Sequence, residues 1–161
     1  MTSITFHPMT KKLAIESLCF AYEPPYDFYN VAVNEENVKE RLDGSYVAAF
    51  VGENLIGFYC TGPSARVPAG YPFGAYERRC TDLGVGLKPS WTGQGKGTPF
   101  FKAVLDEVEK DSESCLRLSV ATFNRRAIRL YSRMGFEADQ AFYSGPDKFI
   151  TMVREATGKK E

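Results

Sequence analysis

The stretch that decides the fold of this sequence is Leu87-Lys88-Pro89-Ser90-Trp91-Thr92-Gly93-Gln94-Gly95-Lys96-Gly97-Thr98. A predicted β-strand ends at its first residues, and an amphipathic helical pattern begins at its last ones. The first backbone N–H groups of a helix have no partner within the helix, and the helix dipole adds positive potential there. Because glycines let an anion approach the backbone closely, the run predicts an anion-binding turn between a strand and a helix.

This run differs from two familiar glycine-rich motifs. It lacks the G-x-x-x-x-G-K-[ST] pattern of a P-loop, and it lies in mid-chain after a predicted hairpin, unlike a dinucleotide fingerprint. Pro99 has no N–H group, so the row of donors ends at Thr98. The chain has 14 glycines, so this run alone is equally consistent with an ordinary loop.

The composition is typical of one globular domain. The chain has 161 residues, of which 43% are hydrophobic and 25% charged, and we assign residues 1–156 to a single domain with a frayed tail at 157–161. The formal net charge is zero, which argues against nucleic acid and against a polybasic membrane contact. We find no apolar run of membrane-spanning length and no signal-peptide pattern, and so expect a cytoplasmic protein.

The cysteines and the histidine exclude several kinds of site. Cys19, Cys60, Cys80 and Cys115 are widely spaced, and we expect all four to be reduced. His7 is the only histidine and falls in a predicted strand, so a cysteine–histidine metal site and a hydrolase with a histidine base are not expected. The sequence therefore predicts no metal.

The order of predicted elements is β-α-α-β-β-β-α-β-α-β-β. The predicted strands span 3–7, 46–51, 55–60, 79–88, 116–120, 137–143 and 148–154, and the predicted helices span 11–20, 35–43, 96–110 and 124–134. A strand–helix–strand–helix centre favours a parallel pair with a right-handed crossover, and the hairpin before it adds antiparallel strands. We expect an α/β fold with a mixed sheet of about seven strands and helices on both faces.

A second motif lies one helix and one strand after the glycine-rich run. It reads Asn124-Arg125-Arg126-Ala127-Ile128-Arg129-Leu130-Tyr131-Ser132-Arg133-Met134-Gly135-Phe136. Together the two motifs resemble the GNAT N-acetyltransferase superfamily, with its Q/R-x-x-G-x-G/A turn and its N-x-x-A-x-x-[LF]-Y-x-x-x-G-F block. The resemblance is strong over 80–137 and extends to the whole chain through the element order. One departure is Thr92, where the family usually has Gln or Arg, which removes a side chain that can brace the turn.

The resemblance implies direct acetyl transfer from acetyl-CoA to a primary amine of a small molecule or protein, in a ternary complex. Backbone N–H groups at the end of the central strand would stabilise the thioester oxygen, where glycines permit close approach. The residues expected to bind the cofactor are Val85, Gly86, Leu87, Thr92, Gly93, Gln94, Gly95, Lys96, Gly97, Thr98 and Asn124. Tyr131 lies seven residues after Asn124 on the same helix face, and the family often uses this tyrosine to protonate the departing thiolate.

The residues that would bind and deprotonate the acceptor amine form no motif as specific as the cofactor-binding turn. Asp82 is our candidate for the general base and Glu77 the second choice, although strict strand alternation puts Thr81 rather than Asp82 on the face of Val85. An aromatic, proline-broken loop supplies the expected acceptor residues Tyr26, Phe28 and Tyr29, with Tyr22, Glu23 and Asp27 beside them.

Two alternatives to an enzyme remain open. One is a sensor of the same fold that binds CoA or acyl-CoA without turnover. The other, less favoured, is a doubly wound nucleotide-binding protein with its ligand at 93–98. The sequence does not identify the acceptor amine, and it leaves a homodimer open.

Overall fold

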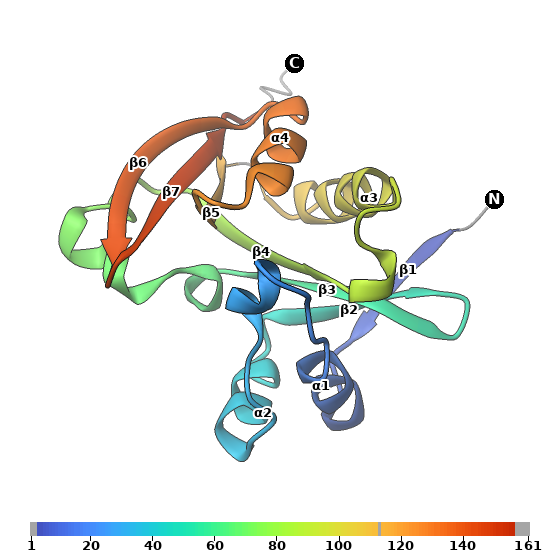
Figure 1. Cartoon of the computed structure of the whole chain (residues 1–161). Helices are drawn as coiled ribbons and strands as arrows, with labels where there is room; N and C mark the ends of the chain where they lie inside the picture. Colours follow the sequence, from blue (N-terminus) through green and yellow to red (C-terminus); the bar gives the residue numbers. More distant parts are fainter. Residues whose placement is uncertain (1–2, 113, 157–161) are drawn as a thin grey trace. The chain divides into compact units, whose positions relative to one another are not determined.

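The computed structural model describes residues 3–112 and 114–156. Within this part the predicted element order is confirmed (Figure 1). The strands are β1 (Ile4–Pro8), β2 (Tyr46–Val51), β3 (Asn54–Thr61), β4 (Thr81–Leu87), β5 (Leu116–Ala121), β6 (Glu137–Ser144) and β7 (Asp147–Arg154). The helices are α1 (Lys11–Leu18), α2 (Glu35–Arg41), α3 (Gly97–Glu109) and α4 (Arg125–Arg133), with 3-10 turns η1 (Tyr26–Tyr29), η2 (Pro63–Ala65), η3 (Pro68–Phe73) and η4 (Pro89–Trp91).

The sheet is mixed, as predicted, with the strand order β1-β2-β3-β4-β5-β7-β6. The chain forms two compact units, which are described separately. The first unit comprises Met1–Cys60 and Val85–Val104, and the second comprises Thr61–Gly84 and Leu105–Glu161.

In the first unit, α1 and α2 lie on the same side of the antiparallel strands β1 to β3 (Figure 1). Consecutive residues of β3 point to opposite faces, as strand geometry requires. A Cβ atom on Gly57 would meet the Phe100 ring of α3 at 3.0 Å, whereas the neighbouring Phe58 ring stacks on Phe20 at 6.3 Å between centroids. On that second face, the guanidinium carbon of Arg41 lies 4.4 Å from the centroid of Phe58. Helices therefore cover both faces of this unit.

Short polar side chains begin the helices. Thr10, Asn34 and Asn124 each accept a hydrogen bond from a backbone N–H group in the first turn of α1, α2 and α4, respectively, as is typical of these residue types at helix N-termini. Helix α1 ends at Leu18, two residues before the predicted end, because Phe20 turns into a buried cluster with Ala48 and Leu55. The predicted apolar face of α3 is confirmed, since it is buried throughout: Phe100, Phe101, Val104, Leu105 and Val108.

In the second unit, β7 pairs antiparallel with both β5 and β6. The parallel pairing of β4 with β5 is formed by Thr81 with Leu116 and by Asp82 with Arg117. The Phe142 and Phe149 rings stack with 5.4 Å between centroids, and both side chains are buried. Segment 62–77, which follows β3 and precedes β4, contains the 3-10 turns η2 and η3.

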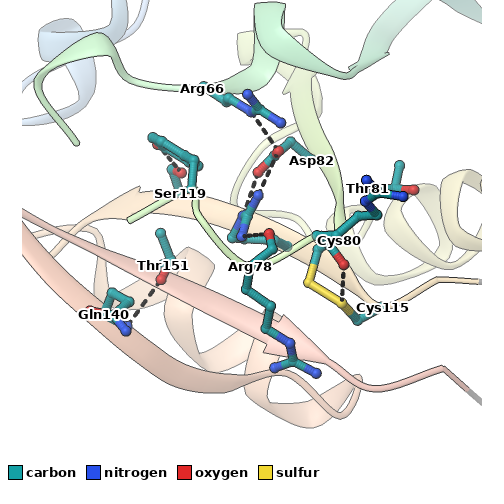
Figure 2. A network of polar contacts seen from close by, with 12 residues as sticks. Arg66, Arg78, Cys80, Thr81, Asp82, Cys115, Ser119, Gln140 and Thr151 are labelled. Carbon is teal, nitrogen blue, oxygen red and sulfur yellow. Dashed lines mark hydrogen bonds and ion pairs between the residues drawn. A yellow bond between two sulfur atoms is a disulfide. The ribbon is translucent and has the colours of Figure 1, made fainter. Parts of the chain in front are cut away.

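Two of the four cysteines are not reduced, which corrects the prediction. Cys80 and Cys115 form a disulfide, whereas Cys19 and Cys60 are free thiols (Figure 2). The physical reason is the register of the parallel pair, because each cysteine immediately precedes one partner of the Thr81–Leu116 pair. Their Cα atoms are 4.8 Å apart, a spacing that permits the bond although 35 residues separate them in the chain.

Candidate active site

The end of β4 carries the backbone expected to contact the thioester. Its residues Val85–Leu87 belong to the first unit and are all partly exposed. A Cβ atom at Gly86 would collide with the ring of Phe58, and one at Gly57 would come within 2.5 Å of the carbonyl oxygen of Gly86. Glycine is thus needed at position 86 because the Phe58 ring packs there, a different reason from the close approach of cofactor that the sequence suggested.

The carbonyl group of Leu87 is anchored from the aromatic loop. The Tyr22 hydroxyl donates a hydrogen bond of 2.8 Å to this carbonyl oxygen, 65 residues along the chain. The loop position is fixed by Asn30, whose side-chain oxygen accepts a 2.8 Å hydrogen bond from the Tyr22 backbone N–H. One residue further, the N–H of Lys88 donates to the carbonyl of Ile56 in β3. Sequence analysis placed Tyr22 near the acceptor but did not find this contact, for which no local pattern exists.

The turn between β4 and α3 is braced by its own side chains. The Thr92 hydroxyl donates a 2.7 Å hydrogen bond to the carbonyl of Pro89, and the Gln94 side-chain amide donates a 2.8 Å bond to the carbonyl of Ser90. The expectation that threonine at position 92 removes a side chain that can brace the turn is therefore wrong. A short hydroxyl reaches the adjacent 3-10 turn, and the amide is supplied two residues later.

The start of α3 offers the features that a diphosphate needs. Gly93 and Gly95 have positive φ angles of 72° and 75°, which favour glycine, and a Cβ atom at Gly95 would meet nothing within 4 Å. The first backbone amide of α3 to bond back along the chain is that of Phe100, to the carbonyl of Lys96. The amides of Gly97 and Thr98 precede it, so they have no acceptor within the helix.

A cation lies beside this turn. The Lys96 ammonium is 4.3 Å from the centroid of the Trp91 ring, in a cation–π contact that holds it at the turn. Open backbone amides, an unobstructed glycine and a positive charge fit the anionic diphosphate of acetyl-CoA.

Helix α4 presents the second motif in the second unit. Asn124 caps the helix, since its side-chain oxygen accepts a 3.1 Å hydrogen bond from the N–H of Ala127. The Tyr131 side chain is buried, and its ring lies 6.3 Å from that of Phe136 between centroids. Asn124 therefore caps α4, whereas a contact of Asn124 or Tyr131 with the cofactor stays a prediction.

Asp82 lies in a buried ion-pair network of the second unit (Figure 2). Its Oδ1 atom accepts a 2.6 Å hydrogen bond from Nε of Arg117, and its Oδ2 atom accepts bonds from Nη2 of Arg117 at 2.9 Å and Nε of Arg66 at 2.7 Å. Asp82 is 2% exposed and the Arg117 side chain is fully buried. Both oxygen atoms of Asp82 accept hydrogen bonds from the guanidinium groups of Arg66 and Arg117. These contacts favour a structural role for Asp82 over that of general base. The second candidate, Glu77, is exposed.

The expected acceptor residues lie in and around η1 of the first unit. Phe28 is 40% exposed, whereas Tyr26 and Tyr29 are partly buried, and the Phe28 and Tyr29 rings meet edge to face at 5.1 Å. The loop that carries them is joined to β4 through Tyr22. The Tyr22 hydrogen bond therefore fixes this aromatic loop to the end of β4.

Comparison with known sequences decides the family. The profile described as the Acetyltransferase (GNAT) family matches residues 12–136. The chain belongs to the GNAT acetyltransferase family. The match spans both motifs and most of the fold, so it confirms the resemblance drawn from the glycine-rich turn and the Asn124 block. A search of curated proteins gave no match.

Solved structures share the GNAT fold with this chain at low sequence identity. The aminoglycoside acetyltransferase AAC(6')-Ib in complex with ribostamycin and coenzyme A is 17% identical, with a TM-score of 0.71 and coverage of 95% of this chain and 93% of that one. A spermidine N-acetyltransferase SpeG chimera from Vibrio cholerae and hSSAT is 18% identical, with a TM-score of 0.65 and coverage of 94% and 95%. The yncA protein from Salmonella typhimurium with its cofactor acetyl-CoA is 14% identical, with a TM-score of 0.59 and coverage of 94% and 93%.

None of the described helices is long and apolar enough to cross a membrane.

Proposed function

We propose that this GNAT protein transfers the acetyl group of acetyl-CoA directly to a primary amine of a small molecule or peptide. The observation that carries the proposal is the braced glycine-rich turn before α3, with its open backbone amides and the Lys96 charge beside it. The antiparallel pairings of β1 to β3 and of β5 to β7 do not suit a doubly wound nucleotide-binding fold, so that alternative is set aside.

Acetyl-CoA supplies a thioester whose carbonyl oxygen gains negative charge when an amine attacks. In the proposal, the backbone of Val85–Leu87 donates hydrogen bonds to that oxygen. The backbone of residues 93–98 holds the diphosphate, with Thr92 and Gln94 fixing the turn beneath it. The Tyr22 hydroxyl holds the Leu87 carbonyl, so it helps to set the orientation of this backbone.

The remaining roles concern protons. We assign the proton for the departing thiolate to the hydroxyl of Tyr131, on the strength of its place in the Asn124 block. The attacking amine must be neutral, and Glu77 replaces Asp82 as our candidate for the general base, because the Asp82 carboxylate is held by Arg66 and Arg117.

A turnover screen tests the proposal. Release of free CoA from acetyl-CoA is measured with amino acids, polyamines, aminoglycosides and peptide N-termini as acceptors. Gly95→Asp places a negative charge against the diphosphate and should weaken CoA binding by about tenfold or more. Gly145→Asp is the matched control, since Gly145 also has a positive φ and open space at its Cβ position but lies in the β6–β7 turn. Equal CoA affinity in both variants would count against the turn as the cofactor site.

The Tyr131→Phe variant separates an enzyme from a sensor. If Tyr131 is the proton donor, kcat should fall by about 10²-fold or more with little change in CoA affinity. Binding of CoA with no turnover of any amine, and no effect of this variant, would favour the non-catalytic sensor.

Location and assembly stay predictions of the proposal. A cytoplasmic protein without nucleic-acid or membrane partners is expected, and a homodimer remains open. The Cys80–Cys115 disulfide is unusual for a reducing compartment, and titration of free thiols in protein alkylated at lysis tests whether the bond is present in the cell.

A further inference from the structure

Segment 62–77, between β3 and β4, is held in place by hydrogen bonds and close packing. The Val67 N–H donates a 2.9 Å hydrogen bond to the Tyr76 hydroxyl, which also lies 2.7 Å from the hydroxyl of Ser119. The Gly62 N–H donates to the carbonyl of Asp82 at 2.9 Å. A Cβ atom at Gly70 would meet the Tyr76 ring at 2.8 Å, so the segment packs without spare room. Apart from Glu77, the function proposed above gives this segment no role.

The ion-pair network of Asp82, Arg66 and Arg117 contains more positive than negative charge. Arg117 and Arg66 share the single carboxylate of Asp82, which leaves one positive charge in excess. Arg117 makes the two-point contact and gives its Nη1 to the carbonyl of Arg78 at 2.8 Å, so each of its three nitrogen atoms donates a hydrogen bond. Among the described residues, Asp82 is the one carboxylate that forms an ion pair with Arg66. The excess charge therefore belongs to Arg66.

Arg66 also has access to solvent. Its side chain is 25% exposed, and its Nε atom donates a 2.7 Å hydrogen bond to Oδ2 of Asp82. Its Nη1 atom makes a long 3.3 Å contact with the hydroxyl of Tyr71, a residue that is 49% exposed. The guanidinium carbon lies 5.9 Å from the Tyr71 ring centroid and 5.5 Å from that of Tyr76. The result is a guanidinium flanked by aromatic rings, with Phe73 exposed on the same 3-10 turn.

We propose that Arg66 and Tyr71 bind the carboxylate of an acceptor that carries both an amine and a carboxylate, which makes the acceptor an amino acid or a peptide rather than a polyamine. A guanidinium presents its donors in a planar fork that matches a carboxylate, and the excess charge repels polycations. The exposed rings of Tyr71 and Phe73 suit an apolar or aromatic side chain on that ligand. This proposal rests on the proposed acetyltransferase function for the identity of the ligand.

The test compares acceptors that differ at the group that Arg66 would bind, which is a carboxylate in one and a carboxamide in the other. The kcat/KM values for L-phenylalanine and L-phenylalaninamide are measured in the wild type and in Arg66→Gln, with Arg79→Gln as the matched control on an exposed arginine of the same unit. We expect the wild type to prefer the carboxylate about 10- to 100-fold, the value of a charge-assisted hydrogen bond, and Arg66→Gln to lose the preference. Thermal unfolding of each variant is measured first, and Tyr71→Phe, which leaves the ion pairs with Asp82 intact, should reduce the preference severalfold.

A binding arm separates this proposal from the function. Calorimetry without cofactor compares N-acetyl-L-phenylalanine with its amide on the wild type and on Arg66→Gln. Turnover of amines with no carboxylate preference in the wild type, or a preference that survives in Arg66→Gln, would overturn the carboxylate site and leave the acetyltransferase standing. Binding of N-acetyl-L-phenylalanine that depends on Arg66, with no turnover of any amine, would support the site and overturn the function.

Discussion

Removing the carboxylate of Asp82 should destabilise the fold strongly. Asp82→Asn keeps the size of the side chain but removes the charge that balances Arg117, whose side chain is fully buried. Three hydrogen bonds of 2.6, 2.7 and 2.9 Å reach this carboxylate, and the amide of an asparagine would turn an N–H donor toward one of the guanidinium groups. Breaking one side of a buried ion pair costs about 3–5 kcal/mol, because a charge is left buried without a partner.

This loss is a large part of the free energy of unfolding of a typical domain. Domains have free energies of unfolding of about 5–15 kcal/mol, and for a chain of this size each kcal/mol shifts Tm by about 2–4 °C. We therefore expect Asp82→Asn to lower Tm by about 6–20 °C. Urea denaturation followed by circular dichroism measures the free energy, and turnover of acetyl-CoA is recorded in parallel at a temperature where both proteins are folded.

A double variant isolates the charge effect. Asp82→Leu combined with Arg117→Met replaces the buried pair by apolar side chains, a change that is often neutral or stabilising. The double variant should therefore recover most of the stability lost in Asp82→Asn. The reasoning is refuted if Asp82→Asn stays within about 1 kcal/mol of the wild type while turnover is abolished, since Asp82 would then be the general base predicted from the sequence.

Three further outcomes are expected. Gly86→Ala should lower the free energy of unfolding by about 1–3 kcal/mol because its Cβ meets the Phe58 ring, and Phe58→Leu in the same chain should restore part of the loss in urea denaturation. Burial raises the pKa of the Cys60 thiol to about 11, so the folded protein keeps this thiol protonated up to a higher pH than the unfolded chain does. Stability should fall by about 2 kcal/mol as the pH rises from about 9 to 11, and Cys60→Ala should flatten that slope in unfolding curves at the two pH values. Reduction of the Cys80–Cys115 disulfide, which links residues 35 positions apart, should lower the free energy of unfolding by about 4 kcal/mol. Thermal melts with and without reductant measure the effect, and identical curves would contradict this prediction.

Local signals predicted the elements and the cofactor turn. The caps Thr10, Asn34 and Asn124 act within three residues of themselves, and the apolar face of α3 repeats within one helix, so their patterns are visible in the chain. The glycine-rich run and the Asn124 block are likewise continuous segments. Their order sufficed to indicate the family before any tertiary contact was known.

The structure departs from the sequence-based expectations at contacts between distant segments. Asp82 looked like a catalytic carboxylate because its partners lie 16 and 35 residues away, at Arg66 and Arg117. The Cys80–Cys115 disulfide depends on the register of β4 and β5, which no local pattern specifies. In each case the chemistry of the side chain was evident, and its partner was decided by tertiary structure.

The Phe58 ring that fills the space above Gly86 has a consequence for sequence change in this protein. Neither position can vary alone, since a larger residue at 86 meets the ring and a smaller one at 58 leaves a void above the strand end. Relatives that carry alanine or serine at position 86 are therefore expected to carry a smaller side chain at position 58, and the two columns should covary. Where that exchange has occurred, the end of β4 no longer carries the aromatic ring that covers it in this protein.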